Sequence, residues 1–441
     1  MKSIRNSFSF VAISLVAAVV GGAAMGQAGP VVAWGSNTFG DSTVPPNLGL
    51  CKAVSSGGDW TLGGYSGHTA VIKLDGTVAC WGANAHSQLN IPPSLGPCIK
   101  ISAGWYHTLV IDMTNHVQSW GGYLYPPVPT DLGVCTEIAA GYLHSLAINA
   151  SGIVRAWGDN SYAGACNVPQ NLGSCKAISA SYYWSMALTT SGNVQTWGSN
   201  ESGQQNVPSD LGTCIGIAAG SSHAAAIQSN GNVKAWGTNN TLGQLNVPDS
   251  LGPCVQIAAG VYHTVALQTN GLVVAWGYNA SGQSTVPTNL GHCTSIAAGG
   301  DHSVAIQVLP SITGVLPISG PSSGNTNITI TGTNFFNPST VTIGGEPATN
   351  VVVVSDTQIT ATTPAGFPGP AVVTVNLGSS TAFYYRPTCG SDVDNNGVVD
   401  NADLGILLLD YGSCSESAAA TEPVEPVQIP MIEQTPLAAK K

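Results

Sequence analysis

The chain has 441 residues, a formal net charge of −11 and only 7% charged residues, against about 25% in an ordinary soluble protein. So few charges cannot support many long, salt-bridged surface helices, and the 54 glycines favour turn-rich β structure instead. The 11 Lys and Arg residues form no cluster. This argues against a nucleic-acid partner, because a phosphate backbone is bound by a positive patch.

Residues 1–28 are predicted to be a secretory signal peptide. Lys2 and Arg5 precede an apolar run of 13 residues, Phe8–Val20, and small residues around Ala24 offer a cleavage site. A membrane anchor is the alternative, but the run is too short to span a bilayer comfortably. We therefore expect a secreted, extracellular or cell-surface protein with no membrane span after signal cleavage, in a compartment that permits disulfides.

A repeat with a period of about 40 residues covers most of the chain. Trp-Gly recurs seven times within phrases of the form VxAWGxNxxGQxxVPxxLGxCxxIAAGxxHxxAI, at Trp34, Trp81, Trp120, Trp157, Trp197, Trp236 and Trp276. In five copies a His lies 13 residues before the next Trp, and Trp184 takes the place of the His in a sixth; the histidines are His68, His107, His144, His223 and His263.

The repeat unit predicts a small sheet of three strands. The 13 residues contain two alternating runs around a Gly-centred turn, which is typical of a β-hairpin, and the xxIAAG segment supplies a third strand. One such unit cannot bury both faces, so the units are expected to stack radially as a β-propeller. Trp34 has no preceding His and His302 has no following Trp. Val31–Gly35 should therefore pair with His302–Gln307 and close a seven-bladed ring over residues 30–308.

The repeated phrases resemble the regulator-of-chromosome-condensation repeat family in its compact bacterial form. The repeat sequence is most similar to that of the secreted propeller that inhibits β-lactamases. The resemblance implies a propeller, but fold does not carry function. The guanine-nucleotide exchange of the nuclear members is not expected of an exported, charge-poor chain.

The repeated Trp and His residues are predicted to be structural, with each His bonding a neighbouring backbone carbonyl. Histidines spread around a ring cannot all reach one zinc ion. The seven repeat cysteines are predicted to be buried free thiols: Cys51, Cys98, Cys135, Cys175, Cys214, Cys254 and Cys293. Cys80 and Cys166 break the pattern and could each form a local bridge.

The variable tips between AAG and His are the candidate binding site. They are rich in aromatic residues, which commonly anchor binding surfaces, and the resemblance to the β-lactamase inhibitor implies the same role. The candidate partner-binding residues are Trp60, Tyr65, Trp105, Tyr106, Tyr142, Tyr182, Tyr183, Tyr262 and Asp301. The alternative is that some rings only cover blade edges, and either a protein or a polysaccharide could bind such rings.

Residues 309–386 carry alternating Val, Ile and Thr runs separated by Gly, Pro and Asn, which predicts a small immunoglobulin-like β-sandwich. The phrases GPSSGNTNITITGTNF and VTIGG resemble the IPT/TIG module. The resemblance implies a spacer or interaction domain.

Residues 388–414 are predicted to be a short calcium-binding loop and helix. The phrase DxDxNGxxDxxD wraps oxygen ligands around one Ca²⁺ ion, here Asp392, Asp394, Asn396, the backbone carbonyl of Val398, Asp400 and Asp403. A solvated acidic turn without metal is the alternative. The loop resembles half of a dockerin or an EF-hand, and a helix is expected over Ala402–Tyr411. Cys389 and Cys414 bracket the unit and are expected to form a disulfide.

Residues 415–441 are predicted to be a disordered tail. The propeller region contains no GxSxG or HExxH motif and its acidic residues are dispersed, so catalysis is not expected. The preferred hypothesis is a secreted binding or scaffold protein with a C-terminal module for tethering. The alternatives are an extracellular polysaccharide-active enzyme, a component of a dockerin-type assembly, or a purely architectural protein of a surface layer or matrix.

Overall fold

The computed structural model describes residues 27–61, 64–122, 127–376, 378 and 380–386, without the side chains of residues 59–66. The predicted calcium module, the Cys389–Cys414 disulfide, the tail and nearly all of the predicted signal peptide lie outside the described residues. In the described part the fold is entirely β, and no helix there is long and apolar enough to cross a membrane.

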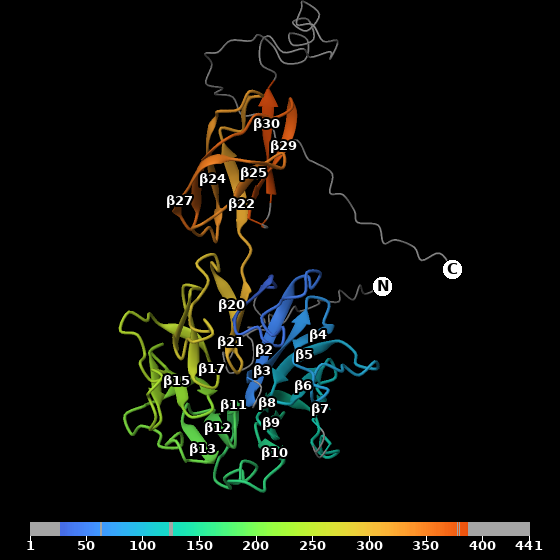
Figure 1. Ribbon diagram of the computed structural model, residues 1–441, viewed down its shortest axis with the longest axis vertical. Coiled ribbons are helices and arrows are strands. Elements are labelled where there is room, and N and C mark those ends of the chain that lie inside the picture. The colour runs from blue at the N-terminus through green and yellow to red at the C-terminus, as the bar shows by residue number, and fades with distance from the viewer. Residues whose placement is uncertain (1–26, 62–63, 123–126, 377, 379, 387–441) are drawn as a thin grey trace, which may run out of the picture.

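Seven sheets of three strands form the blades of the predicted propeller, and Figure 1 views the ring nearly along its axis. Each blade runs from an inner strand to an outer strand through a hairpin. The blades are β2 (Cys51–Thr61), β3 (Gly64–Lys73) and β4 (Val78–Gly82); β5 (Cys98–Ala103), β6 (His107–Asp112) and β7 (Val117–Gly121); β8 (Cys135–Ala140), β9 (His144–Asn149) and β10 (Val154–Gly158); β11 (Cys175–Ala180), β12 (Trp184–Thr189) and β13 (Val194–Gly198); β14 (Cys214–Ala219), β15 (Ala224–Gln228) and β16 (Val233–Trp236); β17 (Cys254–Ala259), β18 (His263–Gln268) and β19 (Val273–Gly277); and β20 (Cys293–Ala298), β21 (His302–Gln307) and β1 (Val31–Gly35).

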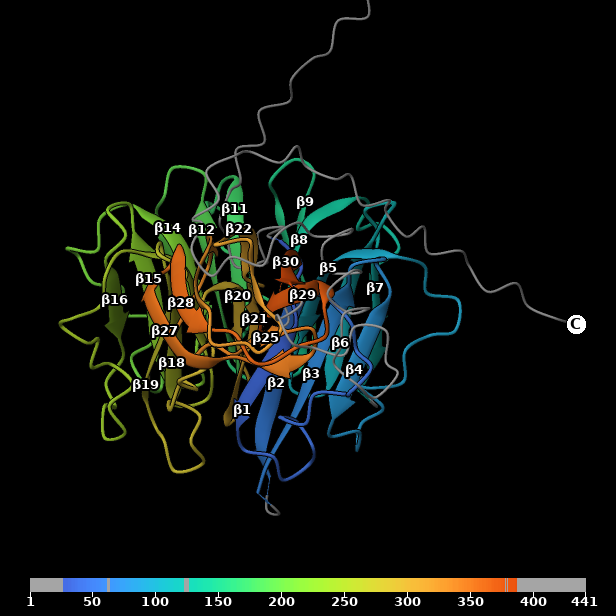
Figure 2. The same cartoon turned by 90° about the horizontal axis from the view of Figure 1, so that it is seen from above.

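The last blade closes the ring as the sequence predicts. Strand β1 pairs antiparallel with β21, from Val31 opposite Ile306 to Gly35 opposite His302. Figure 2 shows β1 on the same side of the ring as β20 and β21, which come from the other end of the propeller sequence, and β21 lies between β1 and β20. The first strand therefore covers what would otherwise be the free edge of the last blade.

The repeated side chains join the blades, but not in the way the sequence suggested. Each ring His bonds a hydroxyl on the next blade and not a backbone carbonyl; for example, His68 Nε2 lies 2.9 Å from Thr108 Oγ1. The carbonyl is bonded by the repeated Trp instead, as in Trp120 Nε1–H to the Gln88 oxygen at 2.9 Å. The Thr108 hydroxyl donates to that same carbonyl at 3.2 Å, so the imidazole Nε2–H must be the donor to the hydroxyl.

The seven repeat cysteines are buried free thiols, as predicted. Each is the first residue of an inner strand, and a β-bulge shifts the strand register directly after it, as between Cys98 and Lys100. Cys80 and Cys166 are also free thiols, so the local bridges considered for them do not form.

The region after the propeller is the predicted β-sandwich. One sheet has the order β22 (Ser311–Leu316), β24 (Asn327–Thr333), β28 (Gln358–Thr362) and β27 (Thr349–Ser355). The other has the order β23 (Ser319–Pro321), β30 (Ser380–Arg386), β29 (Gly369–Val375), β25 (Val341–Ile343) and β26 (Glu346–Pro347). Its core includes Ile330, Ile359, Val373, Phe383 and Tyr385.

Candidate functional site

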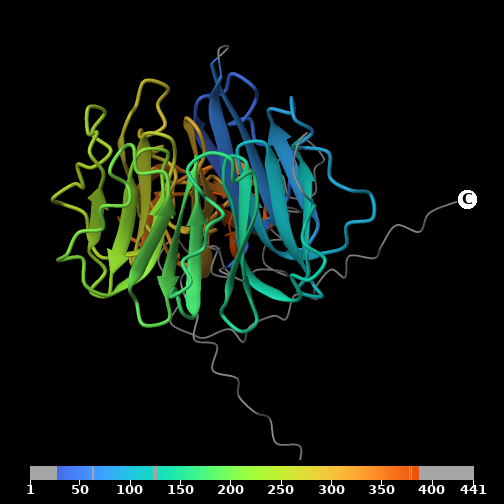
Figure 3. The same ribbon diagram turned by 90° about the horizontal axis from the view of Figure 1, so that it is seen from below.

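The aromatic tips lie on one face of the propeller because every blade runs in the same direction. Each inner strand ends at an AAG tip, and each outer strand ends with Trp-Gly next to the start of the middle strand, as Gly121 lies opposite His107. The tips and the loops that follow Trp-Gly therefore share one face, called here the tip face. Figure 3 shows the longer hairpin of β2 and β3 projecting on this side.

Three neighbouring blades bring five of the predicted aromatic residues into one cluster. The ring of Trp105 stacks on Tyr182 with centroids 4.9 Å apart and meets Tyr142 edge-on at 4.8 Å. Tyr106 lies 5.2 Å from Tyr142, and Tyr183 lies 4.2 Å from Tyr182. Such contacts fix the rings in a continuous layer, so a partner would meet a preorganised surface.

Two further rings extend this aromatic cluster and were missed in the sequence. His86 lies 4.0 Å from Tyr106, and Tyr162 lies 4.6 Å from Tyr183. Both come from the loops after Trp-Gly, whereas only the AAG tips were considered. The sequence did contain a signal for them, because each is an aromatic residue five positions after a repeated Trp. Tyr162 and Tyr182 are the most exposed members, at 44% and 36%.

The other predicted residues do not join the cluster. Tyr262 pairs instead with Tyr278, with centroids 6.5 Å apart, on another part of the tip face. Trp60 and Tyr65 are opposite each other in the backbone register of the β2–β3 hairpin, but their side chains lie outside the described residues. The prediction that Asp301 binds a partner is wrong. Asp301 is only 1% exposed and lies inside the seam between blades, where a partner cannot contact it directly.

The tip face is acidic. Neither the tips nor the loops after Trp-Gly contain a Lys or Arg anywhere in the sequence, whereas Asp159 and Glu201 lie in these loops. The hydroxyl of Tyr162 donates to Glu201, and this bond raises the tyrosine pKa. Lys52, Lys73 and Lys176 lie at the opposite ends of their strands, so these basic side chains are away from the tip face.

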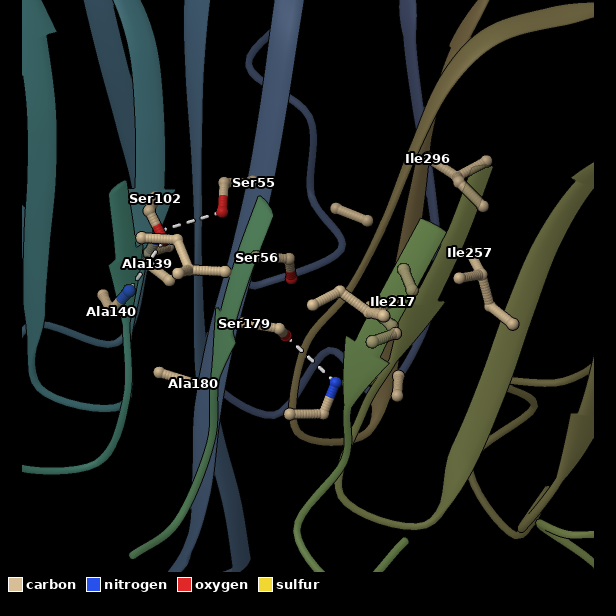
Figure 4. A pocket seen from close by; sticks show the side chains of 18 of the residues that line it. Ser55, Ser56, Ser102, Ala139, Ala140, Ser179, Ala180, Ile217, Ile257 and Ile296 are labelled. Atoms are coloured by element: carbon tan, nitrogen blue, oxygen red, sulfur yellow. Dashed lines mark hydrogen bonds between the residues drawn. The ribbon is translucent and has the colours of Figure 1, made fainter. Parts of the chain in front are cut away.

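A narrow channel runs along the propeller axis with a volume of about 130 Å³. It is lined mainly by the Ile-Ala-Ala, Ile-Ser-Ala or Val-Ser-Ser triplet of each inner strand, and Ser and Gln256 provide its only polar side chains. Figure 4 shows Ser102 and Ser179 in this channel. Their hydroxyls accept N–H bonds from Ala140 and Ala219 of the next blades, both at 3.0 Å. The channel therefore offers no side chain suited to general acid or base catalysis.

The ring histidines, Asp41 and Asp301 are buried titratable groups of the propeller. Burial lowers the pKa of the six ring histidines to about 3 or 4, so they are neutral near pH 7. Burial raises the pKa of Asp41 to about 6 and of Asp301 to about 7. These two carboxyls do not line the channel. Within the described ranges, no group of three or more His, Cys, Asp or Glu could hold a metal.

Comparison with family models agrees with this architecture. The model for the regulator of chromosome condensation (RCC1) repeat matches residues 135–163, 175–204, 214–244 and 254–283. The model for the IPT/TIG domain matches residues 310–388. The four matched repeats start at β8, β11, β14 and β17; the unmatched part includes the blade with the long hairpin and the blade completed by β1. A search of curated proteins gave no significant match.

Solved structures show the same fold at low sequence identity. The chain is similar to Prp20p from Saccharomyces cerevisiae, at 16% identity over 64% of this chain and 92% of that chain, with a TM-score of 0.53. It is similar to the same yeast protein, described as yeast RCC1, in a complex with Kap60, at 15% identity over 70% and 97% with a TM-score of 0.54. Human WBSCR16 matches at 18% identity over 64% and 99%, with a TM-score of 0.50. The chain therefore contains a β-propeller of RCC1 repeats followed by an IPT/TIG domain.

Proposed function

We propose that this protein is a secreted binding protein that holds an extracellular partner on the aromatic cluster of the tip face. The single observation that supports this function is the continuous layer formed by Trp105, Tyr106, Tyr142, Tyr182 and Tyr183. A large, rigid aromatic surface loses little side-chain entropy on binding, which is why such residues dominate binding energy at interfaces.

A protein is the favoured partner class. Trp105 stacks on Tyr182 and meets Tyr142 edge-on. The two most exposed members of the cluster are only 44% and 36% exposed, so few ring faces are open for a sugar to stack on. The acidic loops favour a partner surface with Lys or Arg around an apolar centre. A polysaccharide remains the alternative ligand because aromatic rings also bind sugars.

The test is affinity capture from the native extracellular milieu, with the captured material divided between protease and glycan analysis. We expect the variant Trp105→Ala/Tyr106→Ala/Tyr182→Ala to lose the partner that the wild type retains. Tyr262→Ala is the matched control, since it removes a ring of the same face that lies outside the cluster. Equal recovery by the wild type and the triple variant would refute the proposal.

The C-terminal module is proposed to bind Ca²⁺ as a structural ion that supports tethering. The support is the spacing of Asp392, Asp394, Asn396, Asp400 and Asp403. Calorimetric titration of the full chain with calcium should show one binding event that Asp392→Ala/Asp394→Ala removes. Unchanged heat in that variant would count against the site.

A further inference from the structure

The IPT/TIG domain exposes three large apolar side chains at one end. Phe367 is 94% exposed, Leu316 is 67% exposed and Ile318 is 58% exposed. A single exposed apolar side chain is ordinary, but several together mark a contact surface. We call these three residues the distal apolar patch.

Backbone contacts place the three residues around the C-terminal end of β30. The N–H of Tyr384 donates to the Ile318 oxygen at 2.9 Å, and Leu316 ends the preceding strand β22. The Phe367 loop is held through Gly366, whose N–H donates to the Ser322 oxygen at 2.9 Å. Ser322 in turn donates to the oxygen of Arg386, the last residue of β30, at 2.7 Å.

The patch lies at the end of the domain that points away from the propeller. The opposite end meets the propeller, where a side-chain atom placed on Gly291 would lie 2.5 Å from the Phe336 ring. Figure 1 shows the arrow of β30 pointing away from the blades. The propeller therefore does not cover the patch.

The chain itself continues from this end with an apolar segment. Only 15 residues separate Arg386 from Ala402, so the segment is tethered within about 55 Å of the patch, since each residue spans up to about 3.3–3.6 Å. Leu404, Leu407, Leu408 and Tyr411 have the i, i+3, i+4, i+7 spacing of one helix face. The segment from Cys389 to Cys414 has only 26 residues, too few to bury such a face by itself.

We propose that residues 402–411 dock as an amphipathic helix on the distal apolar patch, so that the IPT/TIG domain and the C-terminal module form one rigid unit. The IPT/TIG domain then serves as the docking base for the module and not only as a spacer. This inference does not depend on the partner proposed for the tip face or on the calcium site.

Hydrogen exchange of the full-length chain tests the proposal. We expect backbone amides of residues 402–411 to be protected in the wild type. In Leu316→Ser/Phe367→Ser their exchange should be faster by about ten-fold or more, because the helix loses its apolar support. Both substituted side chains are exposed, so the melting of the IPT/TIG domain should not change.

Val354→Ser is the control, because Val354 is 57% exposed but lies on β27, away from the patch. It should leave the exchange of residues 402–411 unchanged. Three results would overturn the proposal: no protection of residues 402–411 in the wild type, protection that persists in the double variant, or protection of the patch that depends on protein concentration. The last result would identify a second copy as the occupant.

Discussion

Replacing Asp301 by Asn should stabilise the propeller at alkaline pH and change little at acidic pH. Asp301 is 1% exposed at the seam between the last blade and the loop that follows β1, where its backbone oxygen accepts the Ser36 N–H at 2.8 Å. Its carboxylate oxygens have no hydrogen bond of standard geometry, although Ser281 and Gln283 lie close enough to lower its pKa slightly. Asp41 lies in the same seam, 3.5 Å from the ring of His302.

The magnitude follows from the pKa. Burial, assisted by the nearby Asp41, raises the pKa of Asp301 from 3.8 to about 7, so the folded state favours the protonated carboxyl by up to about 4 kcal/mol. Below pH 3.8 both the folded and the unfolded chain are protonated, and no stability is lost. Between pH 3.8 and about 7 only the unfolded chain ionises, so the free energy of unfolding falls as the pH rises. The amide introduced by Asp301→Asn cannot ionise and should avoid this loss.

The assay is denaturant unfolding followed by tryptophan fluorescence, at about pH 4 and about pH 8. The free energy of unfolding of the variant, relative to that of the wild type, should increase from about pH 4 to about pH 8 by up to about 4 kcal/mol. Asp131→Asn is the control, because Asp131 is exposed and its pKa is lowered by Arg155, which gives a small effect of opposite sign. An identical difference between Asp301→Asn and wild type at both pH values would refute the reasoning.

Three further outcomes are expected. His107→Ala should lower the free energy of unfolding by about 2–4 kcal/mol, because it leaves a cavity and an unpaired Ser145 hydroxyl; the exposed His116→Ala should have almost no effect in the same melt. Gly141→Ala should be strongly destabilising, since its Cβ would overlap the His144 ring and lie 2.7 Å from the Ser181 oxygen, whereas a Cβ on Gly96 meets nothing within 4 Å; similar melting of both variants would contradict this. The repeat thiols should react with a disulfide reagent only after denaturation, because burial raises their pKa; rapid labelling of the native protein would contradict this.

The blade number and the ring closure could be predicted because they are properties of the repeat itself. An unmatched Trp34 at one end and an unmatched His302 at the other have only one pairing that removes both free edges, and β1 adopts it. The aromatic tips could be predicted for a similar reason, since one position in every repeat must lie on one face. Whether the side chains of two tips are in contact depends on the conformation of each loop. The sequence therefore did not show that Tyr182 joins the aromatic cluster and Tyr262 does not.

The burial of Asp301 could not be read from its position in the repeat. Its counterparts in other tips include half-buried aromatic residues such as Tyr183 and Tyr106, but the last tip carries Gly300 before Asp301 and lies beside the loop that contains Asp41. A position that is half-buried in one blade is therefore fully buried in another because the neighbouring loop differs. The repeat specifies the backbone of each blade more strongly than it specifies the environment of each side chain.

The partner of each ring His was nevertheless present in the sequence. The residue after the repeated His position is Ser or Thr in six blades. The hydroxyl of each accepts a hydrogen bond from the histidine of the preceding blade. The exception is Ala224, and the blade before it carries Trp184 in place of His. The hydrogen-bond donor and acceptor are thus lost together, and the Trp184 indole N–H bonds the Gly220 carbonyl of the next blade at 2.9 Å instead. Because a buried hydroxyl without a partner is costly, this paired substitution indicates that blade-to-blade hydrogen bonding, and not metal binding or catalysis, constrains the His position.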